Sequence, residues 1–170
     1  AALGWTPDDR TRLELSGALS DGEAAYADRA MDGVKFARDN LGLRFERQLA
    51  GTHLQGIEAQ AYYNYVDHVM DNYSLREFSP STTMPFQSVS NPDRETTGGR
   101  FTADLAFGER ITATVGVDVQ ENLHTLRATM NETMMPYEAM SRAEDGRFRN
   151  AGVFGELTLA AGSSGRVITG

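Results

Sequence analysis

The sequence of 170 residues contains no cysteine, so it has neither a disulfide framework nor a thiolate metal ligand of its own. It also lacks an apolar run of about 18 residues, which excludes a transmembrane helix. A membrane β-barrel remains open, because a barrel strand shows lipid only every second residue. The net charge of −8 argues against a nucleic-acid partner, which would need a concentrated basic stripe.

Motifs of catalysis are also missing. The chain has no H-E-x-x-H pair, no phosphate-binding glycine loop and no Ser-His-Asp spacing of note. The acids Glu58, Asp104, Asp118 and Glu156 are scattered over different segments and have no accompanying nucleophile. We therefore expect that the protein is not an enzyme.

What the sequence does contain is a strong alternation of apolar and polar residues, which predicts β-strands with two different faces. The clearest case is residues 57–66, where isoleucine, alanine and tyrosine alternate with glutamate, glutamine, tyrosine and asparagine. Further strands are predicted at residues 12–20, 40–48, 100–107, 111–119 and 153–161, with parts of two more at 1–5 and from about residue 166. The sequence thus predicts an all-β, up-and-down antiparallel sheet.

The connections between these strands are alternately short and long. The long ones cover residues 21–38, 71–96 and 121–150, and the short ones include a turn at 108–109 and another over 161–165. In an up-and-down sheet every second connection emerges at the same end, so the three long loops should lie together. Outer-membrane barrels show this asymmetry. We therefore expect residues 1–170 to be part of a single transmembrane β-barrel domain, about eight strands of a larger barrel.

His68 and Met70 are the sharpest chemical feature of the sequence. They share parity with Glu58 and Gln60, so they should lie on the polar face of the strand that begins near Ile57. Their Cα atoms are then about 7 Å apart, close enough for the two side chains to reach one metal ion. Imidazole suits copper, and thioether sulfur favours Cu(I). A lone His-x-Met pair is weakly specific, since a histidine on a polar face is usually only solvated.

Three runs of the sequence carry a family likeness: LGWTPDDRTRLELSGALSDGEAAYADRAMDGVKFARDNLGLRFE, YYNYVDHVMDNYSLREFSP and NPDRETTGGR. They resemble TonB-dependent copper receptors of the Gram-negative outer membrane. The resemblance implies a large barrel that is plugged by an N-terminal domain and takes up copper with energy relayed by TonB. In that family a Cys and a Met of the plug share the copper with a His-x-Met of the barrel wall.

The His68-Val69-Met70 run matches the barrel half of that motif. The resemblance implies a copper ion, the plug domain of the same receptor, the TonB complex and lipid or lipopolysaccharide as partners, and the cell outer membrane as the location. The plug half has no match, because the chain has no cysteine and no plug-like segment. Since the chain also starts at alanine rather than methionine, we expect a processed protein or a piece of a larger one, with the plug domain not present.

The third predicted loop contains a second, weaker set of soft ligands. Its members are His124, Met130, Met134 and Met135, with Met140 nearby. They could form a low-affinity patch that collects copper. Alternatively the methionines only pack the loop over the barrel mouth, since methionine is a flexible gap filler.

Two other functions remain open at this point. In the first, the receptor takes up an organic metal chelate that is gripped by aromatic residues such as Tyr62, Tyr73 and Phe78, and the His-x-Met pair is incidental. In the second, the chain is a soluble all-β binding module that seals its apolar face inside a core.

Overall fold

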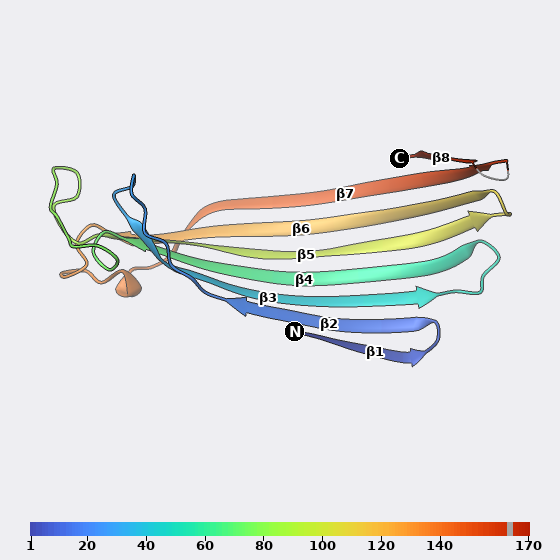
Figure 1. Ribbon diagram of the computed structural model, residues 1–170, viewed down its shortest axis with the longest axis horizontal. Helices are drawn as coiled ribbons and strands as arrows, with labels where there is room; N and C mark the ends of the chain where they lie inside the picture. The colour runs from blue at the N-terminus through green and yellow to red at the C-terminus, as the bar shows by residue number, and fades with distance from the viewer. Residues whose placement is uncertain (163–164) are drawn as a thin grey trace.

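The computed structural model describes residues 1–162 and 165–170, which form one antiparallel sheet with its strands in chain order (Figure 1). The strands are β1 (Ala2–Asp8), β2 (Thr11–Ser20), β3 (Asp32–Gln48), β4 (Leu54–Asp71), β5 (Val89–Phe107), β6 (Ile111–Thr129), β7 (Ala143–Ala161) and β8 (Gly165–Thr169). The predicted all-β, up-and-down antiparallel fold is confirmed. The turn predicted over 161–165 includes residues 163–164, which lie outside the described residues.

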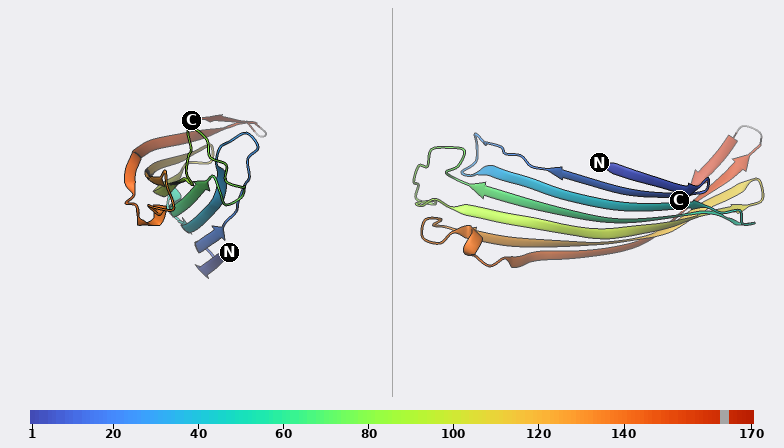
Figure 2. Two further views of the ribbon diagram at one scale, coloured as in Figure 1. Left: turned by 90° about the vertical axis from the view of Figure 1, so that its left-hand side faces the viewer. Right: turned by 90° about the horizontal axis from the view of Figure 1, so that it is seen from below.

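The connections are sorted by length between the two ends of the sheet. Residues 21–31, 72–88 and 130–142 form the long loops at one end, and the described turns at the other end, such as 9–10, are short. Figure 1 shows the three loops together at the left, and Figure 2 shows that the sheet is curved rather than flat. Only one short 3-10 helix, η1 (Tyr137–Ala139), interrupts the strands and loops of the described chain. No helix in the described ranges has the length and apolar character needed to cross a bilayer.

The strands reach further towards the loops than alternation predicted. β3 begins at Asp32 rather than near residue 40, β5 begins at Val89 rather than near residue 100, and β6 runs on to Thr129. The predicted loop bounds of 21–38, 71–96 and 121–150 were therefore too wide. The added segments carry polar residues on both faces, so the alternation disappears there. The backbone ladder continues regardless, because it does not depend on side-chain polarity.

The two faces of the sheet differ as the parity predicts. In the middle of the sheet, residues with odd numbers point to one face, called the odd-numbered face, and residues with even numbers point to the other, called the even-numbered face. One row across the odd-numbered face joins the paired residues Phe45, Ala59, Phe101, Val117 and Val153. These apolar rows are open to the surroundings: Val117 is 47% exposed and Val153 is 84% exposed. Among the described residues, only Val69 and Val89 are buried hydrophobic side chains. The sealed core expected of a soluble module is therefore not what this sheet forms.

Candidate metal half-site at the loop end of the sheet

His68 and Met70 lie near the loop end of β4, on its even-numbered, polar face. The register pairs His68 with Phe36 of β3, and it pairs Met70 with Gly33 of β3 and Ser90 of β5. The pairing of β4 with β5 keeps one register from Asp67 to Met70, so the alternation of side chains is not interrupted between His68 and Met70. The two potential ligands therefore share a face and are two residues apart along the strand.

The imidazole of His68 is held against an aromatic ring. The ring of Phe36 stacks on it with centroids 4.3 Å apart and planes 27° apart. Gly33 permits this arrangement, because a Cβ atom at position 33 would lie 2.3 Å from the Phe36 ring. A register shift in β3 between Gly33 and Lys35 accompanies this close approach. The glycine and the shift together place Phe36 beside the histidine.

The Nε2 atom of His68 is buried and has no hydrogen-bond partner in the part of the chain that the structure describes. Leaving a buried polar atom unpaired costs about 1–3 kcal/mol. An imidazole nitrogen is also a good ligand for copper. Such a nitrogen is therefore a polar group for which metal ligation would supply the missing partner.

The backbone of His68 has an unusual partner. Pro92 of β5 stands opposite His68 in the register, and proline has no N–H to donate. The side chain of Asn91 takes over this role: its Nδ2 atom donates to the carbonyl oxygen of His68 at 3.1 Å. Asn91 has no exposed surface. The carbonyl group of His68 is thus held by a side-chain amide, where a ladder N–H would otherwise donate.

Asn91 is also the centre of a polar cluster on the odd-numbered face. Its Nδ2 atom donates to Asp67 at 2.6 Å, and its Oδ1 atom accepts from Arg127 and from Arg142, each at 2.8 Å. Arg142 also forms an ion pair with Asp93 at 2.9 Å. Every hydrogen-bonding position of the Asn91 amide group is used. The cluster lies beyond the apolar rows, towards the loops.

This cluster fastens the loop 130–142 to the sheet. Arg127 donates to the carbonyl oxygen of Glu138 at 3.2 Å, and its guanidinium lies 4.9 Å from the centre of the Tyr137 ring. Arg142 comes from the end of the same loop and contacts Asn91 and Asp93 directly. The loop is therefore held against the odd-numbered face at several points.

The structure places the members of the second set of predicted ligands on two different elements. The prediction that His124 lies in a loop is wrong: it lies in β6, where it pairs with Arg94 and Gly146 on the even-numbered face and meets the Phe148 ring edge-on at 5.6 Å. The three methionines of this set lie in the loop region, and each is at least half exposed: Met130, Met134 and Met135. Within the described residues, no group of three or more His, Cys, Asp or Glu side chains could hold a metal ion.

The loops 21–31 and 72–88 are joined by Arg76. Its Nε atom donates to Asp32 at 2.6 Å, and its terminal nitrogens donate to the carbonyl oxygens of Tyr26 and Arg29, each at 2.8 Å. Asp32 is buried at the loop end of β3, nine residues beyond the nearest leucine of the apolar rows, Leu41, and so lies outside the band of apolar rows. The hydrogen bonds from Arg76 and from the Tyr26 amide lower the pKa of Asp32 to about 2.

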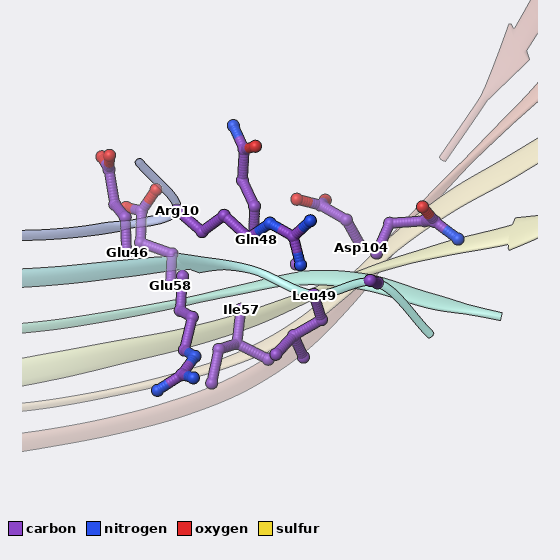
Figure 3. Close-up of a pocket in the computed structure, with 11 residues that line it drawn as sticks. Arg10, Glu46, Gln48, Leu49, Ile57, Glu58 and Asp104 are labelled. Carbon is purple, nitrogen blue, oxygen red and sulfur yellow. The ribbon is translucent and has the colours of Figure 1, made fainter. Parts of the chain in front are cut away.

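A hollow of about 590 Å³ lies at the opposite end, among the short turns (Figure 3). Arg10, Glu46, Glu58 and Asp104 border it. Its acids have their own partners: Arg44 pairs with both Glu46 and Glu58, and the Thr114 hydroxyl donates to Asp104 at 2.7 Å. Since it lies near the start of β4 and His68 lies near the end, the hollow is not part of the metal half-site.

The three aromatic residues considered for a chelate do not converge. Tyr62 lies on the even-numbered face in the middle of β4, whereas Tyr73 and Phe78 lie in the loop 72–88. The nine residue-to-residue steps from Tyr62 to the end of β4 at Asp71 span about 30 Å of extended strand. Tyr62 therefore lies far along the strand from the point where the loop 72–88 begins.

Comparison with known proteins finds similarity to the chain among solved structures. No family model and no curated protein matched the chain. Among solved structures, the chain is similar to one described as Copper transporter OprC, with 42% sequence identity and a TM-score of 0.88 over 98% of this chain. The chain spans 26% of the length of that transporter. The resemblance seen in the sequence is thus confirmed, and the chain is related over nearly its whole length to a barrel segment of the TonB-dependent copper receptors.

Proposed function

We propose that the chain is part of the wall of an outer-membrane TonB-dependent receptor, and that His68 and Met70 supply the wall half of its copper site. The observation that carries the site is the buried Nε2 atom of His68, which has no partner in the described chain and lies on the same face as Met70. The similarity to a copper transporter supports copper as the cargo.

The chemistry of the two ligands favours reduced copper. A thioether binds hard cations poorly, whereas Cu(I) accepts thioether sulfur and imidazole nitrogen together. Two ligands alone bind weakly. A thiolate and a second thioether from a plug would complete a soft, roughly tetrahedral site. Movement of the plug would then separate the two ligand sets and release the ion.

The membrane location is supported by the odd-numbered face. Its exposed apolar rows match the lipid-facing band of a barrel, and aromatic residues stand at both borders of the band. Tyr63 and Tyr65 mark the loop side, and Trp5 and Phe107 mark the turn side. Lipid or lipopolysaccharide would cover this face, while the even-numbered face would turn to the plug.

The test uses the full-length receptor with the separate substitutions His68→Ala and Met70→Ala. We expect each variant to lose bound copper when the metal is counted by mass spectrometry after dialysis under reducing conditions. His124→Ala is the matched control, because it removes an imidazole from the same face and should leave the copper count unchanged. If His68→Ala and Met70→Ala retain the wild-type copper content, the site lies elsewhere.

A further inference from the structure

A pair of arginines lies on the even-numbered face next to His68, two residues closer to the turns. Arg38 of β3 and Arg94 of β5 both pair with Val66 of β4, so the two arginines stand on either side of a small apolar side chain. Their Cα atoms are about 10 Å apart, because each strand spacing is about 4.8 Å. Within the described residues, neither guanidinium has a carboxylate partner, although the chain has 24 acidic and 16 basic residues.

The two arginines border a hollow of about 470 Å³ that also contains amide side chains and no acidic residue. The amide oxygens of Asn64 and Asn122 accept hydrogen bonds within the sheet. Thr96 donates to Oδ1 of Asn122 at 2.6 Å, and Asn40 donates to Oδ1 of Asn64. The amide nitrogens of Asn64 and Asn122 are thereby left as donors. The hollow therefore presents hydrogen-bond donors and positive charge together, which is the complement of an anion.

This concentration of donors is local. Towards the turns, arginines of the same face have acidic neighbours: Arg44 lies 2.9 Å from Glu58, and Arg12 bonds to Glu14. Arg100 lies six residues from Arg94 on the same strand and face, and its guanidinium stacks on the ring of Phe154 at 4.3 Å. Arg38 and Arg94 differ from these arginines in having neither kind of partner among the described residues.

We propose that the hollow between Arg38 and Arg94 is an anion site that binds a carboxylate. The planar fork of a guanidinium matches the two oxygens of a carboxylate and forms two parallel hydrogen bonds with it. The carboxylate belongs either to a small molecule or to another segment of the same receptor. The inference goes beyond copper binding and does not rest on it, since it involves neither His68 nor Met70.

The first arm of the test measures the binding of citrate to the purified full-length receptor by calorimetry at low ionic strength. Arg38→Gln and Arg94→Gln should each weaken citrate binding about tenfold or more, because each removes charge-assisted hydrogen bonds. Arg100→Gln is the matched control. It removes the same charge from the same strand and face outside the hollow, and it should change the affinity by less than about twofold.

The second arm identifies a carboxylate supplied by the receptor itself. In that case wild-type receptor does not bind citrate, and Arg94→Gln lowers the melting temperature more than Arg100→Gln does. The difference should shrink at about 1 M salt, where exposed charges are screened. If Arg94→Gln matches Arg100→Gln in both measurements, the anion site is refuted. Copper content without citrate is counted in the same samples: it should be normal in Arg94→Gln, so failure of one proposal is distinguishable from failure of the other.

Discussion

Replacing Asn91 by leucine should loosen the wall behind His68 without touching either proposed copper ligand. Leucine branches at the same carbon atom as asparagine but has no polar atom. The substitution removes the donor to the carbonyl oxygen of His68 and the contacts to Asp67, Arg127 and Arg142. Each of these four groups then loses its hydrogen bond to residue 91, whose side chain has no exposed surface.

The magnitude follows from the kinds of bonds lost. Three of the four involve charged groups, and such bonds contribute about 1.5–3 kcal/mol each. The full sum overstates the effect, because the charged groups keep other partners: Lys35 for Asp67 at 2.8 Å, and Asp93 for Arg142 at 2.9 Å. We expect a local destabilisation of about 3–4 kcal/mol. This corresponds to an increase of about a hundredfold to a thousandfold in local opening.

Hydrogen exchange read by mass spectrometry on the full-length receptor measures this opening directly. In Asn91→Leu, amides in the loop 130–142 and at the loop end of β4 should exchange faster by that factor, while the turn end stays unchanged. Asn150→Leu is the control, because Asn150 is an exposed asparagine of β7. If the two variants exchange alike in the loop 130–142, the reasoning about the Asn91 cluster is refuted.

Three further predictions test other parts of the sheet. Gly33→Ala should weaken copper binding about tenfold in equilibrium dialysis, since a Cβ atom 2.3 Å from the Phe36 ring must displace the ring that stacks on His68; unchanged affinity would show that the stack does not position the histidine. The pKa of Asp32 is about 2 in the folded protein and about 3.9 when unfolded, so the stability contributed by its bonds to Arg76 of the loop 72–88 is fully present above about pH 4 and is lost as the pH falls towards 2. Hydrogen exchange of loops 21–31 and 72–88 should rise in that window, and a flat profile would contradict a stabilising role for these bonds. Val117→Arg should destabilise the folded receptor in lipid vesicles by about 2–4 kcal/mol, because it places a charge on the exposed apolar row; a change no larger than that of Gln120→Arg on the opposite face would argue against lipid contact there.

Sequence reasoning succeeded where one face of a strand is apolar and the other polar. Between Ile57 and Val66, and between Ile111 and Val119, alternation identified the strands and their parity correctly. It failed where both faces are polar. Asp32 to Asp39 and Ala143 to Asn150 form ladder bonds like any strand, but their side chains carry no alternation that would distinguish them from a loop.

The same limit explains the errors at the candidate site. The sequence predicts a loop at His124 because the residues around it lie in the polar extension of β6. Pro92 and its neighbours read as loop, since proline is normally excluded from the interior of a sheet. The role of Asn91 could not be predicted from local sequence, because its partners Asp67, Arg127 and Arg142 lie on other strands or in a loop and meet only once the register is set.

The proline opposite His68 also makes the wall uneven in stiffness. Paired residues of β4 and β5 run as far as Asp67 and Asp93 and resume at Met70 and Ser90. Within this gap the donor to the His68 carbonyl is a rotatable side chain, which yields more readily than a backbone amide held in a ladder. A slight bend of β4 would shift the imidazole of His68 while the rest of the sheet keeps its ladder hydrogen bonds. In the proposed copper site, a force on the wall would thus displace the His68 ligand while the strands stay paired.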